Sequence, residues 1–134
     1  MSNLADAEYP VKNFNPKSSH PHRAVQAWQI LVGMAMNRQT VTYQGLSKLM
    51  YGKEAAGVLD QILGHIAFFC IDNTLPPLTS IVVGKIRGTP GRDIPVDPAT
   101  IDKEREKVYG HDWFDIYPPS SPDLARAFAR HKSK

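Results

Sequence analysis

The side chains that could do chemistry in this chain are one cysteine, five histidines and a short acidic cluster. A thiolate at Cys70 would be a nucleophile, but this residue lies in the apolar run Phe69-Cys70-Ile71 with no base beside it in the sequence. Because free cysteines are among the most buried residues, we expect an unreactive thiol in the core. A lone cysteine also forms no internal disulfide and no CxxC metal site.

The histidines and the acidic cluster are weak catalytic signals. His111, Asp112 and Asp115 surround Trp113 and could form an acid/base group, but neighbouring residues of a short loop point in different directions, so we expect solvated charges. The histidines lack the HxxxH spacing with which a helix binds zinc, and we expect neither a metal nor another cofactor. They are His20, His22, His65, His111 and His131.

The composition is that of one globular domain. The chain has 134 residues, of which 42% are hydrophobic and 22% charged, which is sufficient for a core. The first twenty residues do not read as a signal peptide, and no stretch approaches the ~20 apolar residues that span a bilayer. We therefore expect a soluble, cytoplasmic protein with no membrane partner.

The net charge of +3 conceals segments of different sign. Residues 21–95 carry seven Lys or Arg against four Asp or Glu, residues 96–117 carry three against six, and residues 118–134 carry four against one. A basic central segment is compatible with binding nucleic acid, but charge alone does not establish it.

A first helix is expected from Pro21 to Asn37, because apolar residues recur there every three or four positions. Thr42 follows a short extended segment and is a suitable N-cap for a second helix over 43–50, which Gly52 can end. Its inward side chains should be Leu46, Leu49 and Met50.

A third helix is expected over 54–71, with Glu54 favourable at its positive end. Its buried face should consist of Ala55, Val58, Leu59, Ile62, Leu63, Ile66 and Phe69. Its other sides should carry Gly57, Gln61, Gly64, His65 and Phe68.

The rest of the chain predicts a strand and smaller elements. Pro76-Pro77 should lead into a strand over 78–83, and the basic segment 84–92 is expected to form a loop or hairpin tip. A charged helix over 98–109 and an aromatic patch over 113–117 should follow, before a last helix capped by Ser121. The expected fold class is α+β, mainly α, a winged helix-turn-helix with extra C-terminal helices. The expected organisation is a flexible arm 1–20, the domain 21–117 and a basic helix or tail 118–134.

The run Trp28–Leu46, WQILVGMAMNRQTVTYQGL, resembles the DNA-binding domain of alkylguanine DNA alkyltransferases and alkyltransferase-like proteins. The later PLTSIV, Pro77–Val82, falls where that family carries Pro-Cys-His-Arg-Val-Val or, in its non-catalytic branch, Pro-Trp-His-Arg. The resemblance covers roughly residues 23–91 and implies a winged helix, with Tyr43 placed against a DNA phosphate.

The departures from that family concern its chemistry. Its nucleophilic cysteine, activating histidine and arginine would fall on Leu78, Thr79 and Ser80, and its base-flipping arginine would fall on Gly57. None of these residues supplies a thiolate, a base or a wedge, so we expect no enzyme and no base flipping.

Two functions remain as alternatives. The first is weak or shape-led binding of double-stranded DNA through the second and third helices and the loop 84–92. The second is a protein interaction module that uses the same surface or the segment 113–117. The expected DNA-binding residues are Thr42, Tyr43, Lys48, Lys53, Gln61, His65, Lys85, Arg87 and Arg92.

Overall fold

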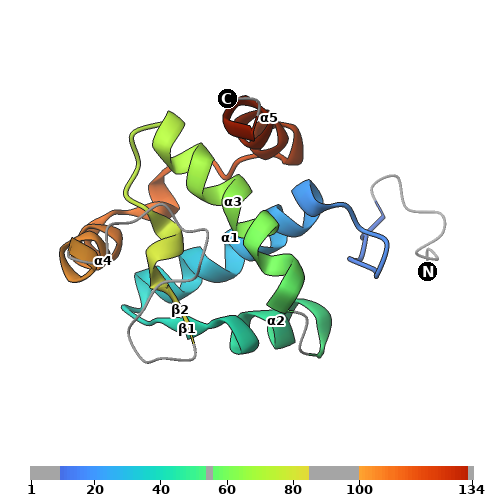
Figure 1. Ribbon diagram of the computed structural model, residues 1–134, viewed down its shortest axis with the longest axis horizontal. Helices are drawn as coiled ribbons and strands as arrows, with labels where there is room; N and C mark the ends of the chain where they lie inside the picture. The colour runs from blue at the N-terminus through green and yellow to red at the C-terminus, as the bar shows by residue number, and fades with distance from the viewer. Residues whose placement is uncertain (1–9, 54–55, 85–99, 133–134) are drawn as a thin grey trace, which may run out of the picture.

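The computed structural model describes residues 10–53, 56–84 and 100–132. These residues form five α-helices and a two-stranded sheet, so the α+β, mainly α expectation is confirmed at that level. The strands are β1, Val41–Thr42, and β2, Val82–Val83. Helix α4 lies at one end of the molecule and the N-terminal segment at the other (Figure 1).

Helix α1, His20–Met36, forms where its apolar periodicity predicts. Ser19 is its N-cap, and Asn37 is its C-cap as expected. The buried apolar side chains of α1 are Ala24, Ala27, Trp28, Leu31, Val32 and Ala35.

Helix α2, Tyr43–Tyr51, begins and ends at the predicted signals. The Thr42 hydroxyl accepts a hydrogen bond from the Gly45 amide at 2.9 Å, and Gly52 ends the helix with a left-handed φ of 74°. Leu46 and Met50 are buried as expected. The expectation for Leu49 is wrong, because this side chain is 57% exposed.

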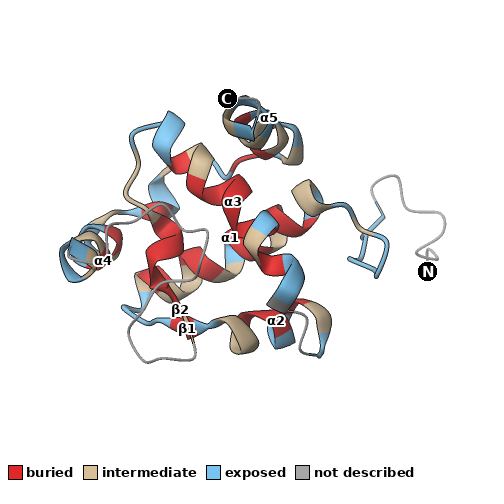
Figure 2. Ribbon diagram, in the orientation of Figure 1, coloured by how far each residue is buried: buried red, intermediate tan, exposed pale blue. Residues whose placement is uncertain are grey.

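Helix α3, Ala56–Asp72, is continuous over the described part of the predicted span, while Glu54 and Ala55 lie outside the described residues. Its one-sided burial pattern was predicted incorrectly. Gly64 and His65 are buried, whereas Val58 near the first turn is 40% exposed. The reason is that α3 packs against α1 on one side and against α5, Ser121–Lys132, on another, so its middle is buried almost all round (Figure 2).

The strand predicted over 78–83 is largely a 3-10 helix, Leu78–Ile81, followed by the two residues of β2. The amide of Ser80 donates to the Pro77 carbonyl at 2.9 Å, which closes this turn. β2 pairs in parallel with β1, in the register Val41 with Val82 and Thr42 with Val83. Packing against α1, α3 and α4 buries the 3-10 helix completely and overrides the β propensity of its residues.

The C-terminal part packs on the same core, with α4 against the 3-10 helix and α5 against α3 and α1. Helix α4, Ile101–Gly110, and a 3-10 helix, Trp113–Asp115, precede α5. Trp113 is buried edge-on against Trp28 at 5.6 Å between ring centroids. The expectation that the whole aromatic segment packs on the domain is wrong, because Phe114 is 69% and Tyr117 is 95% exposed.

Helix α5 begins one residue earlier than its predicted cap implies. The Ser120 hydroxyl accepts from the Asp123 amide at 3.2 Å, and the Asp123 carboxylate accepts from the Ser120 amide at 3.0 Å. This reciprocal capping box makes Ser120, rather than Ser121, the N-cap.

Candidate nucleic-acid interface

The surface formed by α2, the turn after it and the first half of α3 carries most of the described candidate residues. Lys48, Lys53 and Gln61 are exposed. Thr42 is also exposed, and its hydroxyl caps α2. Tyr43 is half-buried and packs against the apolar core. Helices α2 and α3, which carry or adjoin these predicted residues, pack against each other, so their exposed faces and the turn between them are treated as one surface. We call it the helix-turn-helix surface and define it as Thr42, Lys48, Leu49, Lys53, Gly57, Val58 and Gln61.

Side chains from two helices hold the turn between α2 and α3. The Ser47 hydroxyl donates to the carbonyl of Lys53 at 2.8 Å. At the end of α2, Arg23 and Gln26 both donate to the Met50 carbonyl, at 3.0 and 3.3 Å. These bonds satisfy a carbonyl that the helix itself leaves without a partner, and they fix the backbone that carries Lys48 and Lys53.

The exposed side of the first half of α3 carries a residue without a side chain, Gly57, and an uncharged polar residue, Gln61. Nothing lies within 4 Å of where a Cβ at Gly57 would stand, so the helix backbone is open to solvent there. One turn later, Gln61 carries an amide that can donate and accept hydrogen bonds. This surface therefore allows a close approach to the helix but offers few base-reading groups.

His65 does not belong to this surface, and its prediction as an exposed DNA-binding residue is corrected. Only 4% of the residue is exposed. Its ring stacks on Phe128 of α5 with 4.1 Å between centroids, and its Nδ1 lies 2.7 Å from the Gln61 carbonyl. Burial lowers the pKa of His65, an effect that the bond to Gln61 partly offsets. The helical periodicity of α3 predicted an exposed His65, because the residues that cover this side chain belong to α5, which is distant in the sequence.

Lys85, Arg87 and Arg92 lie outside the described residues, as does the turn-prone Gly88-Thr89-Pro90-Gly91.

The positions at which the resemblance would place the alkyltransferase active site are in the core. Leu78, Thr79 and Ser80 are buried, whereas Gly57, where the resemblance would place the base-flipping arginine, is exposed. Cys70 is buried as expected, and burial raises the pKa of its thiol to about 12. At neutral pH this thiol is therefore protonated and shielded from reagents in solvent.

The acidic cluster has a structural explanation. The Asp112 carboxylate accepts a hydrogen bond from the Phe114 amide at 3.2 Å and caps the short 3-10 helix. The His111 ring packs edge-on against Trp113 at 4.6 Å. Within the described ranges, no group of three His, Cys, Asp or Glu side chains could hold a metal ion. His20 and His22 are close in sequence, separated only by Pro21. The described helices also include none with the length and apolarity to cross a membrane.

Sequence reasoning missed Arg23, which is 3% exposed and joins three segments. In addition to the Met50 carbonyl, its guanidinium donates to the Gln26 side chain at 2.8 Å and to the Asn15 carbonyl at 2.7 Å. It also lies 4.2 Å from the ring centroid of Tyr51. The signal available was its position four residues before Ala27, on the buried face of α1.

Comparison with protein families, with curated proteins and with solved structures found no match to this chain.

Proposed function

We propose that this protein is a non-catalytic winged-helix protein that binds double-stranded DNA through its helix-turn-helix surface. The observation that carries the proposal is the pair of exposed lysines, Lys48 and Lys53, on either side of the turn that leads into an open α3. Residues 10–53 carry six Lys or Arg and no Asp or Glu, so the charged side chains of this stretch are all basic.

The arrangement of α1, α2 and α3 supports this proposal. In a helix-turn-helix, the second helix of the pair enters the major groove while the elements beside it contact the backbone. Here α3 would be that helix, with Gly57 allowing close approach and the two lysines meeting phosphates at the groove edge. In the winged-helix form of the proposal, Lys85, Arg87 and Arg92 provide a second set of phosphate contacts.

The proposed specificity is weak or led by DNA shape. Bidentate contact from arginine to guanine is the commonest specific contact in the major groove, and the described part of α3 contains no arginine. Gln61 can pair with adenine, but the burial of His65 removes the second expected reader. Phosphate contacts would therefore dominate the affinity.

The test is duplex binding, measured by fluorescence anisotropy at several salt concentrations. Each phosphate contact contributes about −0.9 to the slope of log affinity against log salt, so Lys48→Ala with Lys53→Ala should flatten the slope by about 2 units. Affinity should fall by similar factors on unrelated sequences. The matched control removes Lys103 and Lys107, two exposed lysines of α4, and should leave the slope unchanged.

A protein interaction module is the second candidate, and exposed apolar side chains favour it. Leu49 and Val58 are exposed on the same helix-turn-helix surface, and Phe114 and Tyr117 protrude beyond α4. Contiguous exposed apolar patches, rather than apolar side chains exposed singly, are typical of docking sites. If the wild-type protein binds no duplex even at low salt, the DNA proposal is wrong and this second function is preferred.

A further inference from the structure

The described N-terminal segment, residues 10–19, is joined at Asn15, through Arg23, to the end of α2. One guanidinium, that of Arg23, donates both to the Asn15 carbonyl at 2.7 Å and to the Met50 carbonyl at 3.0 Å. The same group lies 5.6 Å from the ring centroid of Phe14 and 4.2 Å from that of Tyr51. Arg23 therefore joins the segment directly to the last turn of α2.

The segment also has internal order. The Lys17 amide donates to the Asn15 side chain at 2.7 Å, and the Ser18 amide donates to the Asn15 carbonyl at 3.0 Å. The Ser18 hydroxyl in turn accepts from the Asn15 amide at 3.0 Å. These bonds form a turn over residues 15–18, which leads directly into Ser19, the N-cap of α1. The turn therefore has a defined conformation where it meets the helix.

The contact with Arg23 depends on cation–π attraction and directional hydrogen bonds. Burial raises the pKa of Tyr51, although the charge of Arg23 opposes this shift, so the phenol is neutral at physiological pH. A guanidinium can stack on an aromatic ring while it donates in its plane to two carbonyls, and a lysine ammonium cannot reproduce this geometry. Arg23 is thus suited to position the segment.

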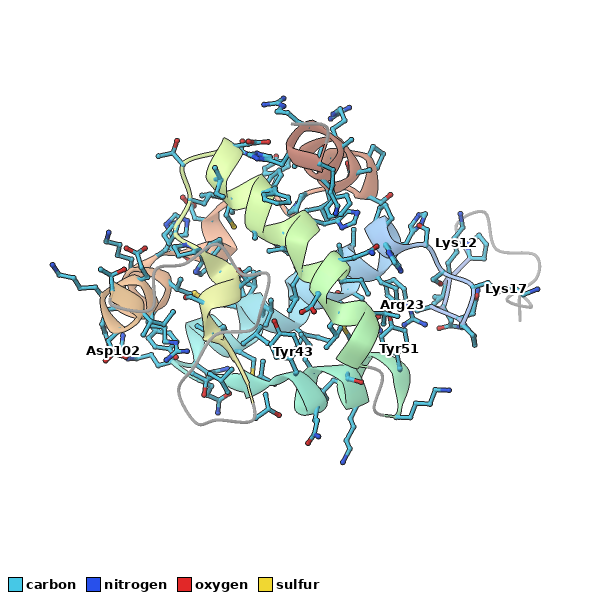
Figure 3. The ribbon with its side chains drawn as sticks, in the orientation of Figure 1. Lys12, Lys17, Arg23, Tyr43, Tyr51 and Asp102 are labelled. Atoms are coloured by element: carbon cyan, nitrogen blue, oxygen red, sulfur yellow. The ribbon has the colours of Figure 1, made fainter. Side chains whose placement is uncertain are left out.

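The position of the segment has a consequence for charge. Asn15 is two residues from Lys17 and Met50 is three residues from Lys53, so the shared guanidinium brings the two lysine-bearing stretches together. Lys12 and Lys17 are both exposed, and no acidic residue occurs in the segment. Figure 3 shows Lys12 and Lys17 at the end of the molecule where Arg23 and Tyr51 lie, far from Asp102.

We infer that residues 10–19 form a second phosphate-binding element, which Arg23 positions beside the turn of the helix-turn-helix. This inference rests on the proposed DNA-binding function and extends its surface from Lys48 and Lys53 to Lys12 and Lys17. The partner is the sugar-phosphate backbone next to the groove that α3 enters. These two lysines add affinity without adding sequence information.

The experiment compares salt slopes of duplex binding for the wild type, Lys12→Ala with Lys17→Ala, and Lys103→Ala with Lys107→Ala. Both double variants remove two exposed lysines, so their changes in net charge are identical. The first should flatten the slope by about 2 units and the second should not change it. Equal slopes for the wild type and the Lys12/Lys17 variant overturn the inference while the proposed function stands. If the wild type binds no duplex DNA, both the inference and the proposed function are overturned.

The positioning role of Arg23 has a separate test. Arg23→Lys keeps the charge but loses the forked donation, so the segment should detach, trypsin should cleave after Lys12 and Lys17 faster, and the slope should flatten by about 2 units. Phe14→Ala, at a partly exposed residue outside the core, should shift both readouts in the same direction if Arg23→Lys does not fold. Unchanged cleavage and slope in the folded variants would overturn the role of Arg23.

Discussion

Two junctions between the elements of this protein are stabilised by different interactions. At the junction of the N-terminal segment, α1 and α2, a buried guanidinium binds backbone carbonyls and aromatic rings. At the junction of α3 and α5, stacked rings form the contact, with His65 against Phe128 and Phe68 against His131.

The two junctions also differ in how they use charge. Near α5, surface cations face acids, because Arg126 pairs with Asp123 at 2.6 Å and Arg130 pairs with Asp72 at 3.7 Å. Near α2, Lys12, Lys17, Lys48 and Lys53 have no ion pair with any described residue. Cations that are paired with acids attract an anionic partner less than cations without such pairs, so among the described residues the difference favours the proposed DNA binding beside α2.

The largest expected effect on stability is at the first junction. Arg23→Ala should lower the free energy of unfolding by about 2–4 kcal/mol, because it removes the hydrogen bonds to the Met50 and Asn15 carbonyls and the contact with the Tyr51 ring, and opens a gap between three segments. Urea unfolding measures this effect. Arg38→Ala is the control, because Arg38 makes an exposed ion pair with Glu106 at 2.8 Å and should cost less than about 1 kcal/mol. Equal losses would show that Arg23 does not stabilise this junction.

The second junction should be weaker but still measurable. Phe128→Ala removes the ring that stacks on His65 and lies 6.1 Å from Phe68, and we expect a loss of about 2 kcal/mol. Phe114→Ala removes the same side chain from an exposed position and should cost less than about 0.5 kcal/mol. If the two phenylalanine variants unfold at the same urea concentration, the α3–α5 contact does not contribute to stability.

The smallest expected effect is a pH dependence confined to the second junction. The folded pKa of His65 is lowered, first by burial and further by the charge of His20, so the unfolded chain binds the proton more tightly. Stability from neutral His65 is therefore complete above the unfolded pKa of about 6.5 and is lost as pH falls below that value. His65→Phe should reduce the loss of stability between pH 7.5 and 5.5. An unchanged loss would exclude His65 as its source.

Local sequence determined the elements that depend on near neighbours. Thr42 and Gly52 bound α2 because a hydroxyl reaches an amide three residues away and glycine adopts a positive φ without strain. The stripe from Ala24 to Ala35 produced α1 because helical periodicity places these residues on one face. The basic character of residues 10–53 is likewise a property of composition.

Tertiary structure alone decided what distant segments cover. The hydrophobic residues of α3 predict one buried face, but α5 adds a second, so His65 is buried while Val58, beyond this cover, is exposed. Leu78–Ile81 became a 3-10 helix because three helices enclose it, although its residues favour a strand. Arg23 joined segments that are eight and twenty-seven residues away from it, and no local pattern encodes such a contact. Burial and long-range hydrogen bonds depend on the whole packed chain, whereas caps and periodicity depend on a few adjacent residues.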